Sequence, residues 1–160
     1  MSKRIIKLGT WDGKPIEWIV LKEENRCLLL LSKKILFTSK YDDNSNNWCQ
    51  SYICKYLNNE FYDVAFSTPE KKRIINAKLE DVQNVKNDVF LLSIEETNNY
   101  LTTEEQRDFT TEIIDYWRLR SSGSDSRRTW CVPKNSDVHD RNPIDYNNSG
   151  IRPAMWIRKK

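Results

Sequence analysis

The amino-acid sequence predicts a single α+β domain that combines antiparallel sheets with two or three helices. The chain begins with alternating apolar residues interrupted by short polar turns, which is typical of strands, and its middle carries apolar residues at helical spacing. A third observation, the polar composition of residues 121–150, predicts a long loop region near the C-terminus. A chain of 160 residues has the size of one domain, so residues 1–160 are assigned to it.

The first part of the chain predicts a small antiparallel sheet. In the segment "IEWIVLKEE", Ile16, Trp18 and Val20 alternate with residues of the opposite face. The turn residues "EENR" separate this segment from the apolar run "CLLLLS", so residues 16–32 predict a hairpin. The segment "RIIKLGTW", residues 4–11, predicts a third strand that precedes the hairpin.

An amphipathic helix is predicted after the polar segment "DDNSNN". Ile53, Leu57 and Phe61 recur every four residues, which places them on one face of a helix. Asn46 or Asn47 can cap its first turn, because asparagine is among the preferred N-cap residues. We therefore expect the three apolar side chains to lie in the core.

A second helix is predicted to begin in the segment "STPEKKRI". Ser67 or Thr68 precedes Pro69, and proline is favoured at the first helical position. Glu70 then lies in the first turn, where the helix dipole favours a negative charge.

The segment "DVFLLSIEE" predicts a strand that passes directly into a helix. Val89–Leu92 is a short apolar run suited to a buried strand. Ser93 and Glu96 have the spacing of a capping box, in which each side chain bonds the backbone N–H of the other residue. Thr103 and Gln106 repeat this spacing and predict one more helix start.

Three strands are predicted in the last third of the chain. They are "YWRLR" at residues 116–120, "TWCV" at residues 129–132 and "IRPAMWI" at residues 151–157. We expect the last of these to share an antiparallel sheet with the N-terminal hairpin. The long polar loop region lies between the first strand and the last.

Arginines occur within two of these apolar strands. A guanidinium carries five N–H donors in a rigid fork, so it can satisfy several loop carbonyls or a carboxylate. We therefore expect Arg118 or Arg120, together with Arg152, to be buried and architectural. Arg127 and Arg128 lie in the polar segment, and we expect them to be exposed and available to a partner.

Composition narrows the function classes only slightly. The chain has 26 Lys and Arg against 23 Asp and Glu, an excess too small to indicate nucleic acid. The longest apolar run, "CLLLL", is far shorter than the ~20 residues that span a bilayer, so no membrane segment is expected. The start "MSKRIIKLGTW" lacks an apolar signal and none of the four cysteines forms a C-x-x-C pair, so we expect reduced thiols in a bacterial-type cytoplasm.

Six stretches of this sequence, taken in order, resemble a bacterial domain family of unknown function, DUF6273. They are "IEWIVL", "CLLLLSKKIL", "NNWCQSYICKYLNNEFYDVAFSTPEKKRI", "DVFLLSIEE", "YWRLRSSG" and "GIRPAMWI", and they span nearly the whole chain. The closing "GIRPAMWI" is also similar to the G-F-R strand that ends C-type-lectin-like domains. This resemblance implies the subtype seen in the formylglycine-generating enzyme and in the variable proteins of diversity-generating retroelements.

The chain departs from the pattern of that family at one place. It has "RSSGSDSRR" where family members have a glycine-rich turn, and Tyr116 where a second Trp is usual. The geometry of this turn is therefore not implied by the resemblance.

Our first functional hypothesis is a non-catalytic binding module that recognises a protein, or a glycan, through residues 121–150. This segment is rich in Arg, Trp, Tyr, Ser and Asn, which serve recognition surfaces, and binding residues often lie on loops of a rigid scaffold. An ordinary packed surface loop would have the same composition. The candidate binding residues are Arg127, Arg128, Trp130, Asp137, His139, Asp140, Arg141 and Tyr146.

Two other function classes stay open. The first is an acid/base or metal-dependent enzyme centred on His139 with Asp137, Asp140 or Asp145, since a histidine near carboxylates can transfer protons or bind metal. The second is a nucleic-acid-binding protein. Its cationic residues would be Arg118, Arg120, Arg127, Arg128 and the terminal "RKK".

No motif predicts a catalytic residue, a cofactor or a metal. The chain has no P-loop, dinucleotide-binding, nucleophile-elbow or H-E-x-x-H pattern, and only four glycines. The clusters "DDNSNN" and "DYNNSG" lack the spacing of a calcium loop and are interpreted as turns.

Overall fold

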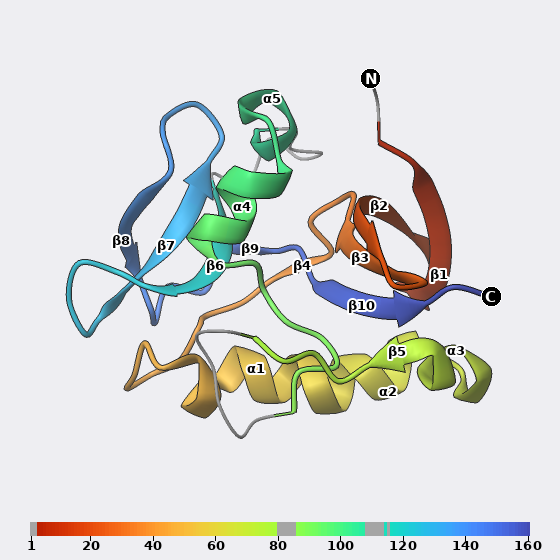
Figure 1. The fold of residues 1–160 in the computed structure, drawn as a ribbon. Helices are drawn as coiled ribbons and strands as arrows, with labels where there is room; N and C mark the ends of the chain where they lie inside the picture. The colour runs from red at the N-terminus through yellow and green to blue at the C-terminus, as the bar shows by residue number, and fades with distance from the viewer. Residues whose placement is uncertain (1–2, 80–85, 108–113, 115) are drawn as a thin grey trace.

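The fold consists of two five-stranded sheets and the helices that pack against them (Figure 1). The computed structural model describes residues 3–79, 86–107, 114 and 116–160. The first sheet contains, in spatial order, β1 (Ile5–Trp11), β2 (Lys14–Glu24), β3 (Cys27–Ser32), β10 (Ala154–Arg158) and β5 (Ile74–Ile75). The second contains β4 (Phe37–Thr38), β9 (Gly150–Ile151), β6 (Tyr116–Ser122), β7 (Arg128–Pro133) and β8 (His139–Pro143). The predicted α+β class is thus confirmed.

Two tight turns join the first three strands, and the second of them lies at the predicted turn residues "EENR". Asp12 and Gly13 have φ values of 52° and 75°, and Asn25 and Arg26 have φ values of 51° and 63°. Positive φ at both central residues is typical of the two-residue turns whose twist matches antiparallel strands. The hairpin over residues 16–32 and its preceding strand therefore form a continuous antiparallel ribbon.

The C-terminal strand joins this ribbon, which confirms that the N-terminal hairpin and the C-terminal strand share a sheet. β10 pairs with β3 in antiparallel register, with Ala154 opposite Leu31. The predicted single strand over residues 151–157 is nevertheless two strands. β9 belongs to the second sheet, and the chain crosses to the first sheet at Arg152 and Pro153.

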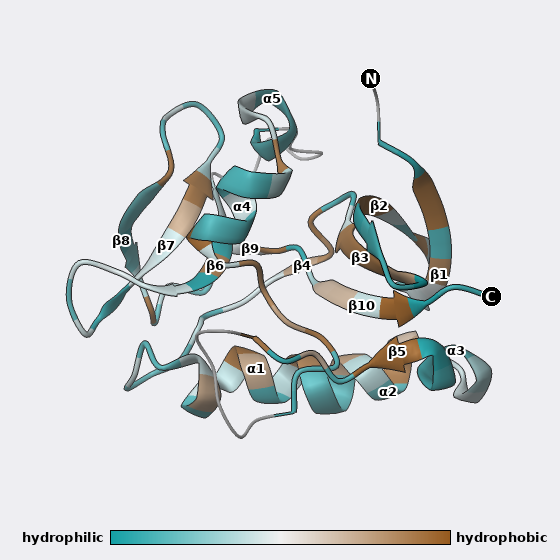
Figure 2. Cartoon of the chain, viewed as in Figure 1, coloured by the Kyte–Doolittle hydropathy of each residue, from teal (hydrophilic) through white to brown (hydrophobic). Residues whose placement is uncertain are grey.

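The predicted amphipathic helix extends from Tyr52 to Ala65 and lies below β10 and β5 in Figure 1. It consists of α1 (Tyr52–Tyr56), a π-helical turn η2 (Leu57–Phe61) and α2 (Tyr62–Ala65). The three predicted core residues, Ile53, Leu57 and Phe61, are all 0% exposed. Figure 2 shows the apolar colouring of β3, β10 and β5. The helix also contacts β1, where the ring of Trp11 lies 5.0 Å from that of Phe61.

Two of the predicted helix starts are confirmed in detail. Ser67 and Glu70 form a capping box at the start of α3 (Thr68–Arg73). Ser93 and Glu96 form another at the start of α4 (Ile94–Tyr100). Asn47 caps a short 3₁₀ turn, η1 (Trp48–Gln50), instead of the long helix, which Ser51 caps.

The capping box predicted at Thr103 and Gln106 is wrong by one residue. Thr102 and Glu105 form the box at the start of α5 (Thr103–Gln106). Gln106 is buried, and its backbone carbonyl accepts a bond of 3.0 Å from the indole N–H of Trp117. Because Gln106 is buried, Glu105 is the side chain that bonds the backbone N–H of Thr102.

The strand predicted at Val89–Leu92 is not formed, although the four residues are 0% exposed. Only Phe90 makes a β-bridge, to Ala154. Partners other than a strand satisfy the neighbouring backbone groups: the Asn58 carboxamide bonds both the N–H and the carbonyl of Val89. Burial alone therefore explains the apolar run.

The predicted loop region over residues 121–150 contains more regular structure than expected. The predicted strand "TWCV" is confirmed as part of β7. β8, with the sequence "HDRNP", was not predicted because it lacks alternating apolar residues. The loops are consequently short segments between the strands of the second sheet.

The expected burial of the strand arginines is confirmed. Arg120 is 3% exposed, and its Nη1 donates to the carbonyl of Leu91 at 2.8 Å and to Glu96 Oε1 at 2.5 Å. Arg152 is 1% exposed, its Nε donates to the carbonyl of Ser32 at 3.0 Å, and its guanidinium lies 4.7 Å from the ring centroid of Trp117. Both arginines therefore connect segments that are distant in the sequence.

Leu57→Ala is expected to lower the free energy of unfolding by about 2–5 kcal/mol, the usual cost of truncating a buried leucine. Urea denaturation monitored by circular dichroism measures this change. Val64→Ala is the matched control, because Val64 lies in the same helix with 69% exposure, and it should change the value by less than about 0.5 kcal/mol. Equal effects of the two substitutions would contradict the orientation of the helix.

Arg152→Lys is expected to lower the melting temperature by about 3–12 °C, because lysine keeps the charge but loses the planar fork that bonds two carbonyls. Arg127→Lys is the control, since the Arg127 side chain is 47% exposed. Differential scanning calorimetry of both variants tests the pair. A larger effect at Arg127 would show that the architectural arginine has been misassigned.

Candidate functional site

Arg118 connects the strands and loops of the second sheet. Its Nε donates to the carbonyl of Ser39 at 3.1 Å, and its Nη1 donates to Thr129 Oγ1 at 3.1 Å. Its Nη2 donates to the carbonyls of Pro143 and Tyr146, each at 2.8 Å. One side chain thereby fixes the backbone that follows β8.

The charge of Arg118 persists although the residue is 0% exposed. Burial lowers the pKa of the guanidinium to about 10, and nearby groups, including Cys131, Tyr41, Tyr116 and Asp145, act in the opposite direction. The side chain is therefore protonated at neutral pH. Three of its four bonds are to backbone carbonyls. These carbonyls stabilise the buried positive charge only while the loops that carry them keep their positions.

Aromatic rings gather on the same side of the sheet as Arg118. The ring of Tyr116 lies 5.8 Å from that of Tyr146 and 6.4 Å from that of His139, measured between centroids. Tyr146 is 36% exposed, and Tyr116 and His139 are partly buried. We call the surface formed by Tyr116, Arg127, His139, Arg141 and Tyr146 the Tyr146 surface.

His139 contacts Cys131, which lies opposite it on β7. The sulfur lies 3.6 Å from Nε2 and 3.8 Å from Nδ1, and the N–H of Arg141 donates to Nδ1 at 3.2 Å. Burial raises the pKa of the Cys131 thiol to about 12, and burial together with Arg141 lowers the pKa of His139. Both groups are consequently neutral at pH 7, which does not favour a thiolate nucleophile.

Two of the three acidic residues that were expected near His139 pair with arginines instead. Asp137 is fully exposed and pairs with Arg107 at 3.2 Å, and Asp145 pairs with Arg127 at 3.5 Å. Asp140 is next to His139 on β8. Within the described residues, no group of three or more His, Cys, Asp or Glu side chains is arranged to hold a metal ion.

Three other predicted site residues differ in their exposure. Arg127 is exposed as expected, and its Nη1 donates to the carbonyl of Asp43 at 2.9 Å. Arg128 was expected to be exposed but is partly buried, because it begins β7 and packs beside Gly123. Thr129 and Cys131 point to the face of β7 that carries Arg118. Trp130 lies between them and points to the opposite face, where it packs against the core.

A polar pocket of about 460 Å³ lies where η1 meets the end of β6, and the sequence analysis did not identify it. The carboxamide of Asn46 stabilises one wall by donating to the carbonyls of Asp125 and Arg128 at 2.9 and 3.1 Å. The only sequence signal was the "DDNSNN" cluster, which was interpreted as a turn. The pocket is lined by Asn46, Asn47, Trp48, Cys49, Arg120, Ser121 and Ser122.

The four cysteines are free and should differ in reactivity. Cys54 and Cys131 are buried, and burial raises the pKa of each thiol to about 12. Iodoacetamide at pH 8, followed by peptide mass spectrometry, should therefore modify the partly exposed Cys27 and Cys49 much faster than the other two. All four should react in the denatured chain, and fast native labelling of Cys131 would contradict the neutral Cys131–His139 contact.

Comparison with known proteins identifies the family of the chain but gives no function for it. No helix in the described part of the chain is both long and apolar enough to cross a membrane. No curated protein and no solved structure matches the chain. The model of one family, described as a domain of unknown function (DUF6273), matches residues 25–159, and the chain belongs to this family.

Proposed function

We propose that this domain is a non-catalytic binding module that recognises a protein partner through the Tyr146 surface. The observation that carries the proposal is the set of four bonds from buried Arg118, two of which hold the carbonyls of Pro143 and Tyr146. A loop held in one conformation loses little conformational entropy when it binds. The segment that presents Tyr146 is therefore organised before a partner arrives.

The residue types of the Tyr146 surface also support recognition of a protein. Tyrosine and arginine are enriched among the residues that contribute most to binding energy at protein interfaces. Tyr146 and Arg127 are exposed and Tyr116 is partly exposed, so their side chains are accessible to a partner. The neutral Cys131–His139 contact favours binding over nucleophilic catalysis at this surface.

A C-type-lectin-like relationship for the fold is part of the same proposal. Its support is the closing segment "GIRPAMWI", which supplies β9 to one sheet and β10 to the other, and the mixture of short strands and helices. A relationship of this kind would make a glycan the principal alternative to a protein partner.

The test compares capture of a partner by three forms of the tagged protein. Tyr146→Ala combined with Arg141→Ala should reduce capture more than tenfold, because residues of this kind contribute about 2 kcal/mol or more each when they anchor an interface. The control combines Lys55→Ala with Val64→Ala, two exposed residues of the long helix, and should capture as the unmodified protein does.

Quantitative mass spectrometry of the captured proteins, followed by calorimetric titration with the protein that is identified, measures these differences. Equal affinity of the Tyr146 surface variant and the unmodified protein would refute the proposed surface. Binding to a glycan array that the same substitutions abolish would instead establish a glycan as the ligand.

A further inference from the structure

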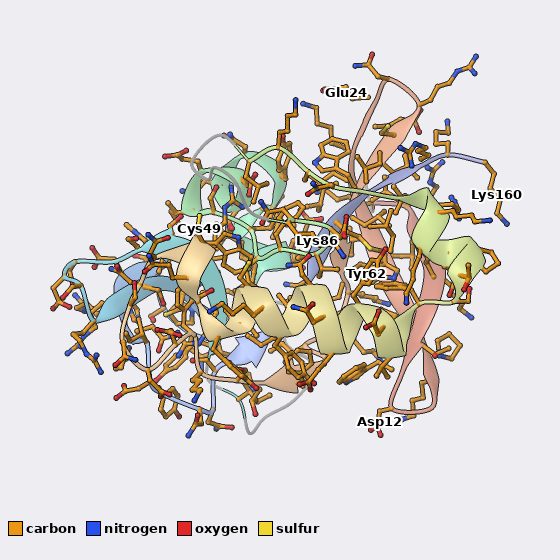
Figure 3. The ribbon with its side chains drawn as sticks, turned by 90° about the horizontal axis from the view of Figure 1, so that it is seen from below. Asp12, Glu24, Cys49, Tyr62, Lys86 and Lys160 are labelled. Carbon is orange, nitrogen blue, oxygen red and sulfur yellow. The ribbon has the colours of Figure 1, made fainter. Side chains whose placement is uncertain are left out.

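Three basic segments that are distant in the sequence meet at one end of the first sheet. Arg73 Nε donates to the carbonyl of Arg158 at 3.1 Å, and Arg158 Nη1 donates to the carbonyl of Lys72 at 3.1 Å. The N–H of Lys159 donates to the carbonyl of Arg26 at 2.8 Å. Figure 3 shows Glu24 and Lys160 at this end, away from Asp12 at the tip of the β1–β2 hairpin. We call this the basic end and define it as Arg26, Lys72, Arg73, Arg158 and Lys160.

Charge is distributed unevenly over the chain as a result. Three more cations adjoin the basic end and pair with two acids: Arg4 and Lys159 pair with Glu23 at 3.6 and 3.2 Å, and Lys22 pairs with Glu24 at 2.7 Å. With Glu70 of α3 included, the whole region holds eight cations and three acids, a net charge of +5, whereas the other 18 cations and 20 acids of the chain give −2. The modest net charge of the sequence conceals this concentration.

The five cations of the basic end form no close ion pair among the described residues. Within the described residues, none of them has a carboxylate oxygen within 4.0 Å. Glu70 is near Arg73, but its carboxylate is occupied by the N–H groups of Gly9 and Ser67 at 2.8 Å each. Side-chain bonds from Arg73 to the carbonyl of Arg158 and from Arg158 to the carbonyl of Lys72 hold the two arginines close together despite their like charge. Binding of an anion would relieve this repulsion.

The surroundings favour a polyanion over a protein interface or a membrane. The large exposed apolar residues of the described chain, Ile5, Tyr52, Val64 and Tyr146, lie outside these three segments. Protein interfaces are depleted of lysine and have an apolar centre, and membrane-surface elements combine cations with an apolar face. Figure 2 shows hydrophilic colouring over part of α3 and over the chain beyond β10. The apolar residues of the adjoining strands, Ile74 and Ile157, are buried.

Guanidinium groups and a neighbouring indole favour single-stranded nucleic acid among polyanions. Three of the five cations are arginines, whose planar forks match phosphate oxygens. Trp156 packs partly against the core and is partly exposed. It precedes Arg158 by two residues on β10, so both side chains lie on one face of the sheet. An aromatic ring beside cations can stack on an unpaired base.

We propose that the basic end binds the phosphate backbone of single-stranded nucleic acid, with Trp156 placed to stack on a base. This surface is separate from the Tyr146 surface and does not depend on the proposed protein partner. Of the cations first considered for nucleic acid, Arg118 and Arg120 are buried and bonded within the fold, so they cannot contact a phosphate. The terminal "RKK" contributes to the basic end.

Fluorescence anisotropy with a fluorescein-labelled single-stranded oligonucleotide of about 20 nucleotides tests the proposal. The logarithm of the association constant should fall with the logarithm of NaCl concentration with a slope of about −3 to −3.5, the value for four or five phosphate contacts on a single strand. Lys72→Glu combined with Lys160→Glu should weaken binding about tenfold or more in low salt and make the slope shallower by about 1.4. Both lysines are exposed, so the variant is expected to fold.

The control combines Lys14→Glu with Lys55→Glu, which changes the net charge by the same amount at exposed positions outside the basic end. It should retain most of the affinity and the full slope. Equal weakening of both variants would show attraction by net charge alone and would overturn the proposal. No saturable binding by the unmodified protein in about 50 mM NaCl, or binding only to phosphatidylserine vesicles or to polyglutamate, would also overturn it.

Discussion

The second sheet depends on one buried cation. A guanidinium removed from water must have its donors bonded, and Arg118 meets this requirement with three backbone carbonyls and one hydroxyl. Because the carbonyls belong to segments near Ser39, Pro143 and Tyr146, these loops must adopt the conformations that present them. The strands of this sheet are short and pair with one another over few residues. The bonds of Arg118 therefore supply part of the stabilisation that longer strands would give.

The parts of the fold that follow from local rules could be predicted from the sequence. The hairpin turn at Asn25, the capping box at Ser93 and the stripe containing Leu57 each depend on residues close together in the chain. Features set by distant partners could not be predicted. The Val89–Leu92 segment forms a single β-bridge instead of a strand, because Asn58 bonds the backbone of Val89. β8 forms because β7 supplies its ladder.

The same distinction applies to the candidate site. Burial of the strand arginines follows from their apolar neighbours, since a guanidinium beside Trp117 and Leu119 must be enclosed and bonded. The pairing of Asp137 with Arg107 could not be predicted from the nearby sequence, because Arg107 is 30 residues away. The basic end was likewise not evident, since its cations come from three segments and are diluted in the total charge.

The crossing of the chain from β9 to β10 connects the two sheets and hence the two proposed surfaces (Figure 1). At this crossing Arg152 bonds the carbonyls of Ser32 and Lys33, at the end of β3, and lies over Trp117 of β6. One side chain thus contacts both sheets while the backbone passes between them. The Tyr146 surface belongs to the second sheet and the basic end to the first, so this contact places the two proposed surfaces on one scaffold.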